Sequence, residues 1–417
     1  MTTLASPAPA GRATQTLARN MKLLAHHELD GFGGMGEGIA MQLADDGRRV
    51  LWMAHESAPK NFTAVDVTDP RAPKVLVQTE LPHMQVRSNS LDVSGNLMAV
   101  AYQTKAVNMQ PAGFDLFDIS VPEAPKLISH FDCSGPFSRG VHALWFVDGK
   151  TVHMAAGAPD FEPHNPLDDQ FYRIIDVSDP AHPVEAGRWW MPGTRVGDTE
   201  PQPERLPAPF DTGFRAHNTN VFPERPDRAY VGYIDGGAVV LDISDKSNIT
   251  VVATWNHSPP FNGFTHTVLP LFERKLWVVS DECVQDDGKD WPKLVWMVDV
   301  RRDNHPMPVS TFPMPPVEVF GKRGGRFGAH NLHENLPVPG SFRSDTIIIG
   351  TFFNGGVRVY DTTDPYRVEE IAYYVPGAPR LSPAGAVQLN DVFVDDRHVV
   401  YTVDRFGGGL YILEMTL

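Results

Sequence analysis

The sequence AVDVTDPRAPKVL at residues 64–76 returns, with variations, five more times along the chain. The other copies are LFDISVPEAPKLI (116–128), RIIDVSDPAHPVEAG (173–187), VLDISDKSNITVVA (240–253), MVDVRRDNHPMPVS (297–310) and VYDTTDPYRVEEIA (359–372). Each copy has an apolar run that ends in Asp, a polar turn that most often reads Ser/Thr-Asp-Pro, and a second apolar run. Asp accepts hydrogen bonds from the backbone of its own turn and Pro presets φ, so each copy predicts two strands joined by a tight turn.

The spacing of the copies predicts the architecture. They recur roughly every 50–65 residues, and a four-stranded propeller blade takes about 40–50 residues, with insertions placed in loops. Six copies and the final strand GGGLYILEMTL (407–417) predict an all-β, seven-bladed β-propeller. The last strand has no partner after it, and MKLLAHHELDG (21–31) aligns with KVLVQTELPH (74–83), the outer strand of the first copy. We expect the N-terminal strand to pair in the last blade and close the ring, which would leave no exposed sheet edge.

Composition limits the partners. The 417 residues carry a formal net charge of −15, which disfavours nucleic acid as a partner. The two cysteines, Cys133 and Cys283, favour a reducing cytoplasm over a disulfide framework. No apolar run is long enough for a signal peptide or a membrane helix, so no membrane partner is expected. We expect a flexible tail at residues 1–20 and one propeller domain at residues 21–417; the oligomeric state stays open, with a homodimer as one option.

The repeated phrases resemble the LVIVD-repeat family of β-propeller proteins. The resemblance covers nearly the whole chain from about residue 21, and GTFFNGGVRVYDTTDP and TVDRFGGGLYILE carry it most closely. It implies the propeller fold but very little about activity, because a fold alone does not fix a function.

One position of each blade's opening strand repeats a polar residue that should face the axial channel. Alignment of GEGIAMQL, SNSLDVSG, VHALWFVD, AHNTNVFP, THTVLPLF, AHNLHENL and LNDVFVDD gives this ring of residues: Glu37, Asn89, His142, His217, His266, His330 and Asn390. Histidine accounts for 16 of 417 residues, so four at one register in four successive blades indicate a shared site. Imidazole suits iron, copper, zinc and nickel. We therefore expect the four histidines to bind one divalent transition metal, with iron favoured and zinc, manganese or copper as options; the alternative is a polar channel in which they bond to one another and to water.

Acidic residues beside the ring are candidates for catalysis. Glu334 and Asp391 could act as a general base, and Glu37 or Asp391 could instead bind the metal. Asp281 and Glu282, in the segment SDEC, could support His266 or simply end a strand, and no catalytic role is assigned to them.

Arginines precede several ring positions. Arg139, Arg215 and Arg326 are candidates for binding an anionic substrate, because guanidinium pairs with carboxylate or phosphate through two hydrogen bonds. Pairing with acidic neighbours between the blades is the alternative.

Neutral residues near the ring complete the expected substrate site. Phe214 and Phe264 could line an apolar substrate pocket, or pack between blades. Asn89 and Asn390 are substrate-binding candidates at the two amide positions of the ring.

Three classes of function follow. The first is a non-haem oxidoreductase or oxygenase for a small anionic or aromatic substrate; the site and architecture are similar to those of carotenoid-cleavage oxygenases, whose sequence motifs the chain lacks. The second is a metal-dependent hydrolase or lyase in which the metal activates water, with propeller lactonases as the nearest precedent. The third is a non-enzymatic binding scaffold. Metal chemistry on a small molecule is the favoured interpretation.

Overall fold

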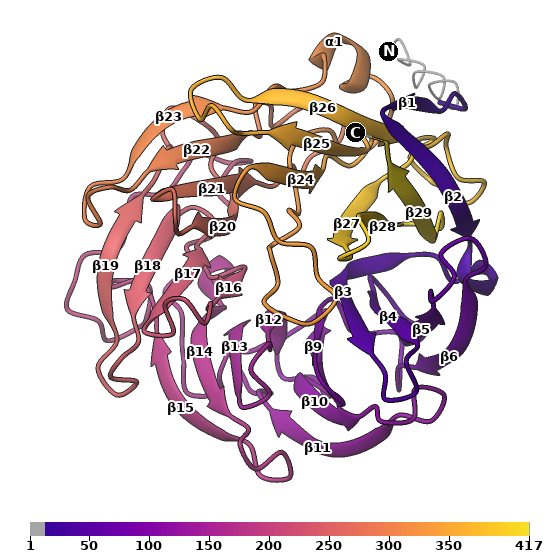
Figure 1. Cartoon of the computed structure of the whole chain (residues 1–417). Coiled ribbons are helices and arrows are strands. Elements are labelled where there is room, and N and C mark those ends of the chain that lie inside the picture. The colour runs from indigo at the N-terminus through magenta and orange to yellow at the C-terminus, as the bar shows by residue number, and fades with distance from the viewer. Residues whose placement is uncertain (1–12, 417) are drawn as a thin grey trace, which may run out of the picture.

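The computed structural model describes residues 13–416, and within them seven antiparallel sheets are arranged in a ring about a central axis (Figure 1). The seven-bladed β-propeller predicted from the repeats is confirmed. The predicted tail at residues 1–20 lies partly outside the described residues. Residues 17–19 within it form β1 (Leu17–Arg19), a strand on the outer edge of blade six.

Blades one to three follow the chain in order. Blade one contains β3 (Met35–Leu43), β4 (Arg49–His55), β5 (Lys60–Asp66) and β6 (Lys74–Glu80). Blade two contains β7 (Val86–Arg87), β8 (Leu91–Ser94), β9 (Leu97–Thr104), β10 (Gly113–Asp118) and β11 (Lys126–Asp132). Blade three contains β12 (Val141–Trp145), β13 (Thr151–Ala156), β14 (Phe171–Asp176) and β15 (Val184–Trp189). The first strand of each blade lies nearest the channel.

Blades four and five repeat this order. Blade four contains β16 (Thr219–Asn220), β17 (Arg228–Gly232), β18 (Ala238–Asp242) and β19 (Thr250–Trp255). Blade five contains β20 (Thr265–Leu271), β21 (Leu276–Asp281), β22 (Val295–Asp299) and β23 (Met307–Thr311). One α-helix, α1 (Val317–Phe320), and two 3-10 turns, η1 (Leu29–Gly31) and η2 (Pro166–Asp168), are the helical elements of residues 13–416. No helix in that range is long and apolar enough to cross a membrane.

The last two blades combine both ends of the chain. Blade six contains β24 (Ile347–Thr351), β25 (Val357–Asp361), β26 (Glu369–Val375) and β1; blade seven contains β27 (Leu389–Val394), β28 (Val399–Asp404), β29 (Leu410–Met415) and β2 (Met21–His27). In blade six the innermost position is taken by an irregular segment, where His333 N–H donates to Ile349 O at 2.8 Å. The antiparallel pairing of β2 with β29 makes an N-terminal strand the outer strand of the last blade.

The repeated Asp explains why each blade turns where it does. The Oδ1 of Asp66 accepts the backbone N–H of Thr68 at 2.9 Å, and the same i to i+2 bond recurs at Asp118, Asp176, Asp242, Asp299 and Asp361. These Asx turns connect the third and fourth strands of blades one to six, whereas those of blade seven, β29 and β2, come from opposite ends of the chain. The second strand β28 is buried along its whole length, whereas the outer strand β6 is partly exposed. The core therefore lies between the blades, toward the inner strands.

Candidate metal centre on the propeller axis

The ring residues occupy the points at which the inner strands lose their regular pairing. The register of β12 with β13 shifts across His142, that of β20 with β21 across His266, and that of β3 with β4 between Met35 and Ile39, which flank Glu37. A β-bulge re-aims the side chain at the extra residue, and bulges are common beside active sites. His217 lies just before β16, and His330 lies in the irregular segment at the innermost position of blade six. The sequence register thus coincides with a backbone irregularity that directs these side chains to the axis.

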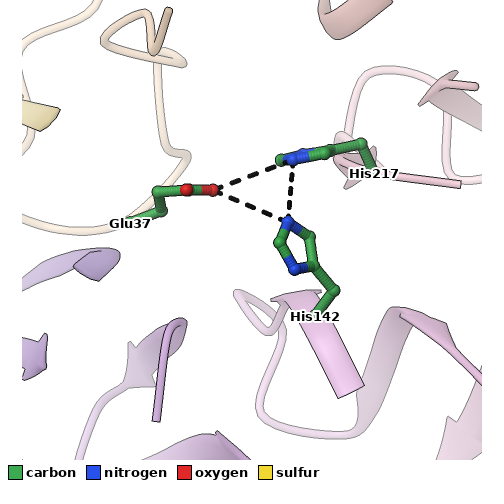
Figure 2. A group of neighbouring side chains, drawn as sticks. All are labelled: Glu37, His142 and His217. Atoms are coloured by element: carbon green, nitrogen blue, oxygen red, sulfur yellow. Dashed lines mark hydrogen bonds and ion pairs between the residues drawn. The ribbon is translucent and has the colours of Figure 1, made fainter. Parts of the chain in front are cut away.

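Four imidazoles converge on one carboxylate. Oε2 of Glu37 lies 3.9 Å from Nε2 of His142, 3.9 Å from Nε2 of His217 and 3.7 Å from Nε2 of His266, and its Oε1 lies 3.7 Å from Nε2 of His330. Figure 2 shows Glu37, His142 and His217 pointing toward one another. The Nε2 atoms of His142 and His217 are 2.8 Å apart. The ring position predicted from the sequence thus brings all four histidines together.

A second carboxylate completes the group. Glu282 follows β21 and places Oε2 3.7 Å from Nε2 of His217 and Oε1 3.7 Å from Nε2 of His330. We call Glu37, the four histidines and Glu282 the axial cluster. The sequence analysis left Glu282 without a catalytic or ligand role. The signal that could have found it is topological: the second strand of a blade runs antiparallel to the first, so its end returns to the level of the ring.

The other ring nitrogens have hydrogen-bond partners of their own. Nδ1 of His217 lies 2.9 Å from the acceptor Asn218 Oδ1, and Nδ1 of His266 lies 2.7 Å from Thr267 Oγ1. Nδ1 of His142 lies 3.2 Å from Gln103 Oε1 and 3.3 Å from Nη2 of Arg87, which can only donate. An Nδ1–H that donates to oxygen leaves a lone pair on Nε2, the arrangement that metal-binding histidines adopt. His330 instead stacks on Phe353, with ring centroids 4.5 Å apart.

Burial sets the charge of the cluster. It lowers the pKa of His217 to about 4 and holds the pKa values of His142 and His266 below the ordinary value, so these rings are neutral at neutral pH. Burial would raise the pKa of Glu37, but the electrostatic interactions with the facing imidazoles of His266 and His330 outweigh it and keep that pKa well below the usual range. The cluster therefore presents neutral nitrogen donors and an ionised carboxylate.

These residues fit a transition metal. Ligands held about 2.0–2.2 Å from one ion are separated by at most about 4.4 Å, and the distances of 3.7–3.9 Å from Glu37 to the imidazoles lie inside that limit. Within 4.8 Å of one another, the ligand atoms form three overlapping groups: Glu37 with His142 and His217, Glu37 with His266 and His330, and His217 with His266 and Glu282. Nε2 of His266, Nε2 of His330 and Oε2 of Glu37 are buried and have no hydrogen-bond partner. A buried polar atom without a partner is costly, and a bound cation would satisfy all three. A donor set of several imidazoles and a carboxylate suits iron, zinc, copper or manganese better than calcium or magnesium.

Comparison with known families agrees with the repeat pattern. The LVIVD repeat model matches residues 169–190, which include β14 and β15, and residues 227–256, which include β17 to β19. Both matches cover the strand–turn–strand phrase from which the propeller was predicted. This chain is an LVIVD-repeat β-propeller.

Comparison with solved structures supports the same fold. A protein from Bacteroides uniformis provisionally named 6-phosphogluconolactonase superposes with a TM-score of 0.52 over 81% of this chain and 85% of its own, at 11% sequence identity. A likeness at that identity concerns the fold alone. A sequence search of the curated proteins gives no match.

A layer of carboxylates lies on one side of the axial cluster in this LVIVD-repeat propeller. Asp92, Glu334 and Asp391 line a cavity of about 40 Å³ together with Glu37, and all three follow the ring residue of their blade in the sequence. Burial raises the pKa of each of these three carboxyls above its ordinary value. Glu334 accepts hydrogen bonds from Asn218 at 2.7 Å and from Asn220 at 2.8 Å. Of the three acidic residues predicted to be catalytic, Glu37 thus belongs to the axial cluster, whereas Glu334 and Asp391 lie beside it in the channel.

Arg139, Arg215 and Arg326 precede the ring residues of their blades, whereas the three carboxylates follow theirs, so we infer that these arginines form a layer on the opposite side of the axial cluster. Arg139 pairs with Asp169 through two hydrogen bonds of 2.6 and 3.1 Å, and Arg326 donates to Oε1 of Glu282 at 2.7 Å. Of the three predicted substrate-binding arginines, these two are paired with neighbouring acids. Arg215 contacts no carboxylate among the hydrogen bonds and ion pairs of the described residues; it donates to Thr212 O and to Gln170 Oε1.

The remaining residues predicted to bind substrate also fall into two groups, those free to contact a ligand near the axial cluster and those engaged in packing or hydrogen bonds within the propeller. Phe264 lies edge-on to His217 with ring centroids 5.9 Å apart, whereas Phe214 packs in the hydrophobic core under the guanidinium of Arg205. Asn390 donates to Met35 O and Gly36 O and so fixes the strand that carries Glu37. Asn89 is fully buried, and neither of its side-chain polar atoms has a partner.

Proposed function

We propose that this protein is a metalloenzyme that binds one divalent transition metal at the axial cluster and acts as a non-haem oxidoreductase on a small anionic or aromatic substrate. The observation that carries the proposal is the convergence of four buried Nε2 atoms within 3.9 Å of the Glu37 carboxylate. A non-enzymatic scaffold would gain nothing from buried, partnerless donors that face the axis.

The distribution of ligands around the axis supports a reaction centre over a closed structural site. Histidines come from blades three to six and Glu37 from blade one, while blades two and seven contribute amides. The amide of Asn390 is engaged with backbone carbonyls, whereas that of Asn89 has no partner. A catalytic metal keeps a position free of protein ligands. With a metal bound, the amide of Asn89, which has no partner among residues 13–416, would be free to bond to an exogenous ligand.

A metal held mainly by neutral imidazoles keeps most of its positive charge and supplies redox or Lewis-acid chemistry when bound. The protein's own residues orient the imidazoles and exclude water. The Nδ1 partners orient the imidazoles, and Phe264 and Phe353 exclude water from two sides of the cluster by packing against His217 and His330. The arginine layer draws anions toward the axis.

A metal-dependent hydrolase or lyase is the second candidate. The buried carboxyls Glu334 and Asp391 favour it, because their pKa values are raised by burial toward the range of a general acid or base. They line the cavity next to Glu37, within the same channel.

Metal analysis of the purified protein with a parallel oxygen-uptake assay separates the candidates. Iron or copper with oxygen consumption supports the first, and zinc or manganese without redox activity supports the second. His217→Ala and His266→Ala should each lose the metal and remain folded. His182→Ala is the matched control, since the His182 side chain is 83% exposed and far from the axis in the turn of blade three. Full metal occupancy in both axial variants, or no metal in the wild type, would contradict the proposal.

A further inference from the structure

Most arginines on the open side of the axial cluster are neutralised by carboxylates. Arg87 and Arg405 both donate to Oε1 of Glu56, at 2.7 and 2.6 Å. Arg139 and Arg326 are paired with Asp169 and Glu282, as described above. Each of these contacts is a charge-assisted hydrogen bond within normal distance, so each of these four guanidiniums has a carboxylate partner, one of which Arg87 and Arg405 share.

Arg215 differs from them. Its Nε donates to Thr212 O at 3.2 Å and its Nη1 to Gln170 Oε1 at 3.0 Å, and both acceptors are neutral. The carboxylate that acts on it most strongly through space, Asp169, is engaged with both donors of Arg139. Half-buried positive charge with neutral partners is unfavourable unless an anion compensates it.

Gln170 provides an independent observation at the same place. Its side chain is fully buried, and its Nε2 has no hydrogen-bond partner. The amide orientation is fixed, because Arg215 can only donate and therefore requires Oε1 on its side. Among the described residues, Gln170 thus holds a buried donor without an acceptor beside a guanidinium that has no carboxylate partner.

This pair lies beside the axial cluster, on its open side. Arg215 precedes His217 by two residues, and its charge acts on both His142 and Glu282. The surrounding arginine side chains are partly exposed, at 25% for Arg87 and 31% for Arg139, whereas the side chain of His217 is 2% exposed. Solvent therefore reaches the arginine layer above a buried cluster.

We propose that Arg215 and Gln170 form the subsite that binds the carboxylate group of an organic substrate. Binding of the carboxylate does not depend on the proposed function; only the reaction of the rest of the substrate, at the metal, rests on it. One guanidinium without an anion matches one negative charge, and a guanidinium N–H together with an amide N–H matches the two oxygens of a carboxylate. A phosphate dianion would leave one charge uncompensated, so the subsite selects a carboxylate.

The test is calorimetric titration of the purified full-length protein with benzoate, with benzamide and inorganic phosphate as comparison probes. The wild type should bind one benzoate and bind benzamide and phosphate at least about tenfold more weakly. Arg215→Gln should weaken benzoate at least about tenfold, because a hydrogen bond to a charged group contributes about 1.5–3 kcal/mol. Gln170→Glu, which is isosteric and supplies the missing anion, should weaken it similarly, and Arg215→Lys should retain most of it. Arg195→Gln, in the loop that follows blade three, is the control and should bind as the wild type does.

Metal content measured on the same samples separates this inference from the proposed function. Unchanged metal with benzoate binding lost in Arg215→Gln and Gln170→Glu supports both. Benzoate binding that depends on Arg215 in a protein without metal supports the subsite and contradicts the metalloenzyme. Absence of benzoate binding in the wild type, equal binding in wild type and both variants, or tighter binding of phosphate than of benzoate overturns the subsite and leaves the metal centre standing.

Discussion

Glu37→Gln should change the stability of the protein in opposite directions with and without metal. The substitution keeps the shape of the side chain and removes one negative charge from the centre of four imidazoles. Without metal, Oε2 of Glu37 is a buried charged atom with no hydrogen-bond partner, whose desolvation costs about 1–3 kcal/mol. Gln can donate to an imidazole lone pair instead, so the metal-free variant should be as stable as the wild type or more stable.

With metal bound, the change in stability caused by Glu37→Gln has the opposite sign. Loss of a residue that only supports a metal ligand typically weakens binding 10–100-fold, and Glu37 faces the site directly, so we take about 100-fold. At a free metal concentration of about 1,000 times the wild-type dissociation constant, binding stabilises the wild type by about 4.1 kcal/mol and the variant by about 1.4 kcal/mol. Unfolding entropy near 2.1 cal/mol/K per residue gives about 0.9 kcal/mol per degree for this chain length. The metal-induced rise in Tm should thus fall from about 5 °C to about 2 °C.

Differential scanning calorimetry of both proteins, in EDTA and in excess metal, measures all four melting temperatures. Glu334→Gln is the matched control, because it removes a carboxylate from the same channel that hydrogen-bonds to Asn218 and Asn220 and lies outside the axial cluster. Its metal-induced rise should equal that of the wild type. An equal rise in Glu37→Gln and wild type would refute the assignment of Glu37 to the metal site.

Three further outcomes are expected. Gly232→Ala should cost about 1–3 kcal/mol and reduce metal content, because a Cβ there would lie 1.9 Å from the His266 carbonyl oxygen; unchanged metal content would contradict this. Burial lowers the pKa of His153 to about 4, so unfolding takes up a proton below pH 6.5, and the free energy of unfolding in EDTA should fall from pH 7 to pH 5. In denaturant titrations, His153→Asn should reduce that fall by about 2 kcal/mol. An identical fall in the variant and the wild type would disprove the role of His153. Deleting residues through His27 should lower Tm by more than either substitution, since β29 loses its partner; an unchanged Tm would rule out a stabilising role for β2.

Most of the fold could be predicted from the repeats, because six of the seven blades contain the same strand–turn–strand sequence. Asp66 and its five counterparts cap their own turns, so the motif is legible without tertiary information. The common register of the four histidines could be predicted for the same reason, because each histidine occupies the same position of its repeat. The short strand β1 was not, because Leu17–Arg19 has no pattern of its own and pairs only through the edge that β26 offers.

The pairings around the cluster could not be predicted, because they depend on distances between blades. Glu282 joins the site through the return of β21 to the ring level, far in sequence from Glu37. The sequence likewise gave no way to separate Arg215 from Arg139 and Arg326, since only the positions of Asp169 and Glu282 decide which guanidiniums already have an anion.

The central claim is that one metal ion binds where the four imidazoles meet. An anomalous-difference map from crystals of the protein as purified, with data collected on both sides of the absorption edge of the metal found in solution, tests it directly. We expect a single peak on the axis, about 2.0–2.2 Å from Nε2 atoms of the axial histidines. A map without a peak there, or with its peak away from the axis, would contradict it.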